Sequence, residues 1–358
     1  MTAPNARSIA LDCLLLITEE GQFSHVVLAA ARDKFAWMPE EERALTERLV
    51  HGSVEYLPQL DRLIAARSKT PFRKLKPVIR CILRLSLYQL LYLSRIPAHA
   101  VVNEAVKLTE RRGLFGLKGF VNAMVRRFVR ERDEIRAELD GSQDFALRYA
   151  LPPWLAERFT AQFGREESEK IAARFLEPAP LTLRLNRTGF IAAGEPAAAT
   201  EGLTQSPYAP DSFIAEEGLT EPIRQQLAEG MFFVQDLSSS LAVQAAQPKP
   251  GERVLDLCAA PGGKTGHILE LADCHVTALD IDAGRLKRVG DNLDRLGFGE
   301  TRKTRFQTAS LYCADARDLA AWYDGKQFDA VLADVPCTAS GVVRRNPDIK
   351  WSRRPTDA

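Results

Sequence analysis

The spacing of apolar residues divides the chain into a helical part and a later part in which strands and helices alternate. Up to residue 140, apolar residues recur at intervals of three and four, which predicts amphipathic helices. Five segments show this spacing: ARSIALDCLLLITEE, EERALTERLVHGSVEYL, VIRCILRLSLYQLLYL, HAVVNEAVKLTERR and GFVNAMVRRFVRERDEI. Prolines and glycines lie between them, as helix breakers do. We therefore predict an all-α bundle over residues 1–140.

Residues 141–235 predict a small connecting subdomain of mixed α and β structure. LPPWLAERFTAQFG and SEKIAARFL predict two short helices, and APLTLRLNR predicts a strand. The stretch 189–210 is rich in Pro, Ala and Gly, which is typical of loops.

From residue 236 to 358 the pattern predicts an α/β domain. ERVLDL, HVTALD, FQTASLYCADA and FDAVLAD carry four strands, separated by helical patterns such as TGHILELA and AGRLKRVGDNLDRLG. Strands that alternate with helices imply crossover units and a parallel, doubly wound sheet. We expect a Rossmann-like domain that includes about strands one to four.

The bulk composition favours an ordinary globular protein of the cytoplasm. Apolar residues make up 46% and charged residues 27% of the chain. No apolar run is long enough to span a bilayer, and the N-terminus lacks the pattern of a secretory signal. The six cysteines form no C-x-x-C pair, which argues against a zinc site or a disulfide framework. We expect a monomer with no metal and no membrane partner.

The net charge of +1 hides a strong asymmetry. Residues 61–130 contain 16 Lys and Arg but only 3 Asp and Glu. Such a concentration favours a polyanionic partner such as nucleic acid over a set of merely solvated helix faces. A second basic stretch, 342–354, surrounds Trp351, which either stacks on an RNA base or covers the edge of the sheet.

Candidate chemistry gathers where the predicted parallel strands end. CAAPGGKT (258–265) follows strand one, Asp280 ends strand two, Asp315 follows strand three, and Asp334 ends strand four. Ligands of such sheets bind beyond the carboxyl ends of the strands. The spacing fits neither a phosphate-binding P-loop, whose first glycine position holds Cys258, nor a dinucleotide G-x-G-x-x-G motif.

What remains is a nucleoside-type ligand held by acids, and S-adenosylmethionine fits this description. Asp280 would bind its ribose and Asp315 would lie near its adenine. Its methionine end would lie over the 258–264 loop.

Several motifs together resemble one family. VLDLCAAPGGKT, LDID and DVPCTASGVVRRNPDIKW resemble the RsmB-type RNA cytosine-5 methyltransferases of small-subunit (16S) ribosomal RNA. VNEAVKLTERRG and GFVNAMVRRF resemble the NusB-type RNA-binding domain that this family carries. FFVQDLSSSLAV resembles its lead-in to the first strand. The resemblance implies S-adenosylmethionine as cofactor and 16S rRNA as partner, bound through 61–130. It implies these cofactor-site residues: Cys258, Ala259, Ala260, Pro261, Gly262, Gly263, Lys264, Asp280, Asp315 and Asp334.

Cys337 lies in the Pro-Cys pair after strand four. Methylation of cytosine C5 needs a thiolate that adds to C6 and pushes electron density onto C5. DNA cytosine-5 methyltransferases take this thiolate from their Pro-Cys motif. In the RNA enzymes resembled here it comes from a Thr-Cys motif after the next strand. The resemblance therefore implies that Cys337 assists product release and that Asp334 also contacts the target cytosine.

The 358 residues contain no Thr-Cys dipeptide. At roughly 30 residues per strand–helix unit, a seven-stranded sheet would need about 70–90 more residues. We therefore expect a C-terminally truncated enzyme with negligible turnover, whose strand four presents an unpaired apolar edge. The alternatives are a non-catalytic RNA-binding or assembly protein, a transfer-RNA cytosine-5 methyltransferase, and a DNA methyltransferase with Cys337 as nucleophile.

Overall fold

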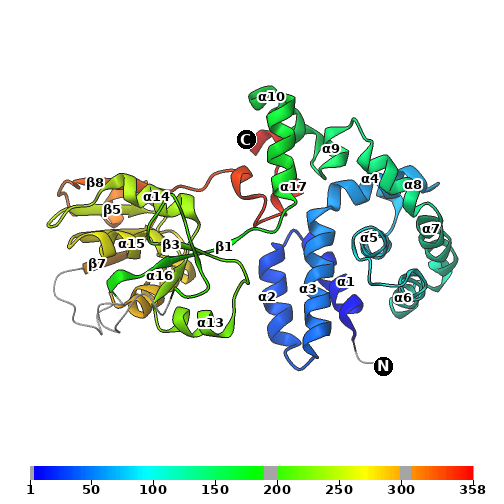
Figure 1. Ribbon diagram of the computed structural model, residues 1–358, viewed down its shortest axis with the longest axis horizontal. Coiled ribbons are helices and arrows are strands. Elements are labelled where there is room, and N and C mark those ends of the chain that lie inside the picture. The colour runs from blue at the N-terminus through cyan, green and yellow to red at the C-terminus, as the bar shows by residue number, and fades with distance from the viewer. Residues whose placement is uncertain (1–3, 189–199, 299–307, 358) are drawn as a thin grey trace. The chain divides into compact units, whose positions relative to one another are not determined.

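The computed structural model describes residues 4–188, 200–298 and 308–357 (Figure 1). The chain forms two compact units, one of residues 1–178 with 338–358 and one of residues 179–337. We call them the helical unit and the sheet unit. The domain boundaries expected near residues 140 and 235 stay predictions.

The helical unit confirms the bundle predicted from the apolar spacing. Its main helices are α1 (Ala6–Thr18), α2 (Ser24–Lys34), α3 (Glu40–Glu55), α4 (Leu57–Arg67), α5 (Pro77–Tyr92), α6 (Ala98–Arg111), α7 (Lys118–Arg130), α8 (Arg132–Asp140), α9 (Phe145–Arg148) and α10 (Pro153–Phe175). Short 3-10 turns, η1 (Phe72–Lys74) and η2 (Phe115–Leu117), precede α5 and α7.

Helix α5 is the central element of this bundle. Twelve of its sixteen residues are buried, which explains why its sequence is apolar on nearly every side. On α3, Gly52 lets the ring of Tyr88 approach the backbone. A Cβ at Gly52 would lie 2.0 Å from a ring carbon of Tyr88. Glycine is therefore required at this helix contact.

Helix α10 contains the two short helices predicted for this stretch, separated by a kink. Gly164 adopts φ 75° and ψ 167°, a conformation that glycine reaches without steric cost. The segment 338–358, which includes η4 (Ser340–Val342), α17 (Ile349–Ser352) and η5 (Pro355–Asp357), packs in the same unit. Its Val343 and Ile349 join the apolar cluster of α9 and α10.

The same segment is anchored to the bundle by buried polar groups. Ser24 Oγ donates to Asp348 Oδ2 over 2.6 Å, and Lys350 Nζ donates to the carbonyl of Glu55 over 3.2 Å. Trp351 packs against the core of the bundle. The prediction that Trp351 covers the edge of the sheet is therefore wrong, because buried contacts hold its segment on α2 and α3.

The described residues of the sheet unit form two four-stranded sheets. An antiparallel sheet has the order β2 (Thr204–Gln205), β3 (Ser212–Ala215), β1 (Leu181–Leu185), β4 (Phe232–Val234), with helix α13 (Glu221–Ala228) between β3 and β4. A parallel sheet has the order β7 (Thr308–Cys313), β6 (His275–Asp280), β5 (Arg253–Leu257), β8 (Ala330–Ala333). Its helices are α14 (Leu237–Ala246), α15 (Gly263–Leu271) and α16 (Ala283–Leu296), and a 3-10 turn, η3 (Leu319–Ala321), precedes β8. The predicted α/β class and four parallel strands are confirmed.

Strand β8 lies at one edge of the described parallel sheet. Among the described residues it pairs only with β5, and Val331 in it is 58% exposed. The apolar, unpaired edge expected for strand four is present in this part of the chain.

Candidate functional site

The parallel register brings the predicted site residues to one edge of the sheet. Leu257 at the end of β5 is level with Leu279 and Ala333, and Asp280 is level with Cys313. The loops after β5, β6, β7 and β8 therefore begin at the same edge, where ligands of open α/β sheets bind.

The loop after β5 makes a sharp turn before α15 begins. Its Cys258 has φ 59° and its Gly262 has φ 95°, two left-handed conformations within five residues. A Cβ at Gly263 would lie 2.6 Å from the ring of Phe233. The first turn of α15 then presents N–H groups that have no acceptor within the helix. Such groups bind anions, including carboxylates.

Asp280 holds this loop in place. Its Oδ2 accepts from the backbone N–H of Ala260 over 3.3 Å, and its Oδ1 accepts from that of Asp282 over 3.1 Å. The carboxylate is buried, and Arg285 Nη2 lies 3.6 Å from it. In this structure Asp280 therefore fixes the loop through hydrogen bonds to its backbone. Its role toward a ribose remains a prediction.

The two other predicted acids, exposed Asp334 and half-buried Asp315, are paired with cations. Asp334, which follows β8, forms an ion pair with Lys264 of α15. Asp315 binds Arg317, whose side-chain hydrogen bonds lower the pKa of Asp315 to about 2. Cys337 is exposed and follows Asp334 by three residues. The Lys264–Asp334 pair thus joins the loop after β5 to the loop that bears Cys337.

A cavity of about 150 Å³ lies beside the loop of residues 258–264, which we call the glycine loop. Its wall is formed by the segment from Phe233 to Asp236, Ser239, Asp256, the segment from Cys258 to Pro261, Gly263 and Lys264. Asp280, Asp315 and Asp334 do not line it. The structure thus brings six of the seven predicted loop residues together around one cavity, and Gly262 does not line it.

Asp256 is a site residue that the sequence analysis missed. It is 1% exposed in the middle of β5, and its Oδ2 accepts from Thr265 Oγ1 over 2.7 Å. Its Oδ1 is buried and has no partner among the described residues. Burial raises the pKa of Asp256 to about 6. The sequence carried a signal for this residue, because an acid stands between the apolar residues of VLDL. A charge in a buried strand costs free energy unless it is paired.

Arg184 fixes the same loop from the antiparallel sheet. It is fully buried on β1, and it donates to Gln235 Oε1 over 2.5 Å and to the Gly263 carbonyl over 3.3 Å. It also forms a buried ion pair with Glu270 of α15. An Arg in a strand gave no sign of this contact, because its partners lie about 50 to 90 residues further along the chain.

These groups fit a cofactor such as S-adenosylmethionine. The vacant Asp256 Oδ1 can accept a hydrogen bond from an ammonium group, and the first turn of α15 can bind a carboxylate. Together they match the two charges of an amino-acid end. The acids at the strand ends suit a sulfonium cation and ribose hydroxyls.

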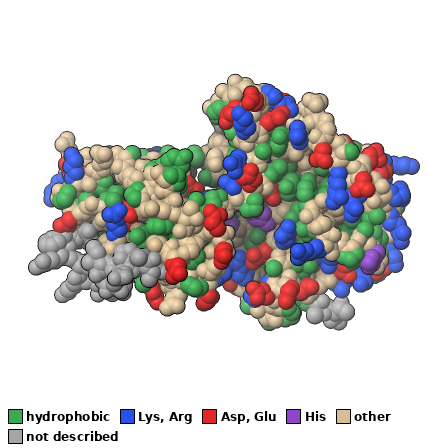
Figure 2. All heavy atoms as spheres, in the orientation of Figure 1, with side chains coloured by type: hydrophobic (Ala, Val, Ile, Leu, Met, Phe, Trp, Pro, Cys, Tyr) green, Lys and Arg blue, Asp and Glu red, His purple; other side chains and the backbone are tan. Residues whose placement is uncertain are grey.

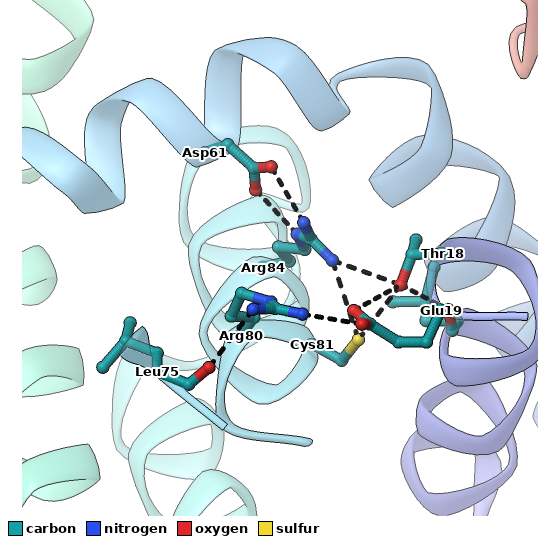
Figure 3. Close-up of polar contacts among 8 residues, drawn as sticks. Thr18, Glu19, Asp61, Leu75, Arg80, Cys81 and Arg84 are labelled. Atoms are coloured by element: carbon teal, nitrogen blue, oxygen red, sulfur yellow. Dashed lines mark hydrogen bonds and ion pairs between the residues drawn. The ribbon is translucent and has the colours of Figure 1, made fainter. Parts of the chain in front are cut away.

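The basic block of the helical unit contains two kinds of cation. One kind supports the fold: Arg84 binds both carboxylate oxygens of Asp61 over 2.6 and 2.8 Å, and Arg80 binds Glu19 over 2.6 Å (Figure 3). Both guanidinium groups also lie over the ring of Phe72. Arg62, Arg67, Lys107, Arg112, Lys118 and Arg127 are likewise in ion pairs.

The other kind is exposed and has no acidic partner among the described residues. Its members are Lys69, Arg73, Lys74, Lys76, Arg95, Arg111, Arg126 and Arg130. Four of them lie between α4 and α5 in residues 69–76, which we call the basic loop. Leu75 in it is buried, and its carbonyl accepts from Arg80 Nη1 over 3.2 Å (Figure 3). Figure 2 shows Lys and Arg side chains on the visible face of the helical unit.

The described residues offer neither a metal-binding cluster nor a membrane-spanning helix. Within the part of the chain that the structure describes, no group of three or more His, Cys, Asp or Glu side chains could hold a metal ion. None of the described helices is both long enough and apolar enough to cross a membrane.

Comparison with known proteins gives two family matches. A family model described as 16S rRNA methyltransferase RsmB/F matches residues 243–358, and the NusB family model matches residues 4–130. The solved structure of PH0851 superposes with a TM-score of 0.74 at 23% identity, covering 99% of this chain and 79% of that one. This likeness shows a shared fold.

Closer relatives are found among characterised sequences. The ribosomal RNA small subunit methyltransferase B of Pseudomonas putida is 38% identical over 358 residues, which is 99% of this chain and 78% of that protein. Its counterpart in Escherichia fergusonii is 37% identical over 99% of this chain and 79% of that protein. These matches show that the chain belongs to the RsmB family of 16S rRNA methyltransferases.

Proposed function

We propose that this protein takes part in S-adenosylmethionine-dependent methylation of C5 of a cytosine in 16S rRNA. The sheet unit would bind the cofactor and present the Pro-Cys loop, and the helical unit would bind the RNA. One observation carries the proposal: a buried acid with a vacant oxygen, Asp256, lies in a cavity beside the first turn of α15.

The cofactor would be held by the residues from Cys258 to Lys264 together with Asp256, Asp280, Asp315 and Asp334. When bound, S-adenosylmethionine supplies the methyl group. Asp256 would hold its ammonium group, and the α15 N-terminus would hold its carboxylate. Asp280 already fixes the loop through Ala260 and Asp282, so the backbone needs little reorganisation on binding.

Asp334 and Cys337 would face the target base. The exposed Cys337 thiol would assist release of the methylated product, and Asp334 would orient the cytosine. The attacking thiol of this family is expected in a Thr-Cys pair, which the 358 residues do not contain. We therefore expect this chain to bind cofactor and RNA but to turn over negligibly.

RNA would bind to the exposed cations of the basic block. The basic loop presents Lys69, Arg73, Lys74 and Lys76 on a turn fixed by the burial of Leu75. Cations that are not neutralised by neighbouring acids are the ones that can contact phosphates and release counterions.

Two assays test the proposal. Equilibrium dialysis should detect binding of radiolabelled S-adenosylmethionine to the purified chain, and Asp256→Asn should weaken it about tenfold by removing the charge. Asp294→Asn, an exposed acid on α16, is the matched control and should leave binding unchanged. Absence of binding by the unmodified chain would refute the cofactor site.

The second assay incubates the chain with unmethylated 16S rRNA and labelled cofactor. We expect no label in cytosine above background. Transfer to cytosine C5 would overturn the expectation of negligible turnover while supporting the reaction. Transfer to transfer RNA alone would overturn the 16S rRNA substrate.

A further inference from the structure

A second cavity, of about 230 Å³, lies within the helical unit between α10 and the segment 338–353. Trp154, Arg158 and Gln162 of α10 line one side, and Thr338, Ser340 and Arg353 line the other. We call it the Trp154 pocket. It belongs neither to the glycine loop nor to the basic loop.

The polar groups of the Trp154 pocket suit an anionic ligand. Arg158 is exposed and has no acidic partner among the described residues. Arg353 uses its Nε to donate to the Thr338 carbonyl over 3.2 Å, which aims the guanidinium without neutralising it. None of the residues that line the pocket is acidic. Two guanidinium groups without a carboxylate are typical of a phosphate-binding site.

The remaining groups suit a flat ring with hydrogen-bonding edges. Trp154 is half-buried and packs in the same apolar cluster as Leu155 and Phe159, so its indole is a firmly held wall. The hydroxyl oxygens of Thr338 and Ser340 lie 3.3 Å apart, and Gln162 adds an amide. At about 30 Å³ per water, the volume corresponds to about seven or eight waters. That is room for one nucleotide and not for a longer ligand.

One residue that lines the pocket is adjacent in the chain to Cys337. Thr338 directly follows Cys337, and consecutive Cα atoms are about 3.8 Å apart. A single peptide bond therefore joins a residue that lines the pocket to the exposed Cys337. A strand that presents a base to the Cys337 loop can offer a neighbouring nucleotide to the wall that begins at Thr338.

We propose that the Trp154 pocket binds a nucleotide that flanks the target cytosine in single-stranded RNA. The base stacks on Trp154, and Arg158 and Arg353 bind its phosphate. The pocket would then select an unpaired flank, because a base inside a duplex cannot reach an indole face. This inference rests on the proposed function, since it takes RNA as the substrate.

The test is fluorescence anisotropy with a labelled single-stranded 12-mer RNA that has one cytosine between uridines. Arg158→Gln and Arg353→Gln should each weaken binding about five- to tenfold. Trp154→Leu should weaken it about tenfold, as expected for the loss of one stacked base. Arg174→Gln on the same helix removes an equal charge away from the pocket and should change affinity less than about twofold. Thermal melting of each variant checks that it folds.

The outcomes separate this inference from the proposed function. If both arginine variants bind like the unmodified chain while replacement of the basic loop weakens binding, the pocket is refuted and RNA binding stands. If the unmodified chain does not bind the 12-mer, both proposals fail. Competition by a phosphoserine peptide but not by uridine monophosphate would also refute the nucleotide and assign the pocket to a phosphopeptide.

Photocrosslinking tests directly whether the flanking nucleotide contacts the Trp154 pocket. A purely structural role of Trp154 would not produce a crosslink. The 12-mer with 4-thiouridine next to the cytosine should crosslink to the peptide that contains Trp154. With 4-thiouridine five nucleotides away, this crosslink should disappear. Equal crosslinking from both positions would contradict a flanking-nucleotide site.

Discussion

The carboxyl edge of the parallel sheet and the basic block of the helical unit were both evident in the sequence, but they differ in how much of each is available to a ligand. At the sheet edge, each predicted residue lies where its strand ends. In the basic block, half of the 16 cations are in ion pairs with acidic side chains, and two of these, Arg84 and Arg67, are buried. The number of charges in a segment therefore overstates the number of unpaired cations, whereas the ends of parallel strands bring the predicted residues to one edge of the sheet.

The difference has a simple cause. The register of parallel strands places their ends together whatever the rest of the chain does. The pairing of a cation depends on residues elsewhere in the chain, such as Asp61 of α4 for Arg84 and Glu131 between α7 and α8 for Arg67. Substitutions that change either the stability of the fold or the binding of RNA, but not both, distinguish the two kinds of residue.

The largest effect is expected for Arg184→Met in the sheet unit. It leaves the buried Glu270 carboxylate without its cation, which costs about 3–5 kcal/mol of unfolding free energy. Urea unfolding measures this loss. Adding Glu270→Leu should restore much of the stability. A double variant as unstable as the single one would show that Arg184 acts mainly through Gly263 and Gln235.

In the helical unit, replacement of all four cations of the basic loop by Gln should leave stability within about 0.5 kcal/mol. It should weaken binding of 16S rRNA fragments about 100-fold. The slope of the logarithm of the binding constant against the logarithm of the salt concentration should become less steep by about three. Arg84→Gln is the contrasting variant, since it should lower stability and leave the salt dependence unchanged. The reverse pattern would show that the ion-paired cations are the RNA contacts.

At the sheet edge, the buried Asp256 should make the stability of the chain depend on pH. Burial raises its folded pKa to about 6, above the ordinary 3.8, so the folded chain binds this proton more tightly than the unfolded chain. Stability from this group is full below pH 3.8, falls as the pH rises, and is lost above pH 6. Asp256→Asn should therefore raise the unfolding free energy by about 3 kcal/mol at pH 7 and by nearly nothing at pH 3.5. A pH-independent difference would contradict the buried charge.

The smallest effect concerns two glycines, one from each region. Gly263→Ala should destabilise the chain by about 1–2 kcal/mol, because its Cβ would lie 2.6 Å from the Phe233 ring. Gly119→Ala on α7 meets nothing within 4 Å and should stabilise by about 0.5 kcal/mol. Thermal melting compares them. Equal effects of both substitutions would show that the loop after β5 has room to relax.

The sequence by itself determined the elements and the edge where they act. Apolar periods of three to four and of two are local properties, so the helical bundle, the strands β5 to β8 and the glycine loop could be predicted from them. The vacant oxygen of Asp256, the clamp of Arg184 on Gly263, the place of Trp351 and the Trp154 pocket could not. Each depends on contacts between residues far apart in the chain, and only the packed tertiary structure decides which of them are buried, paired or left open.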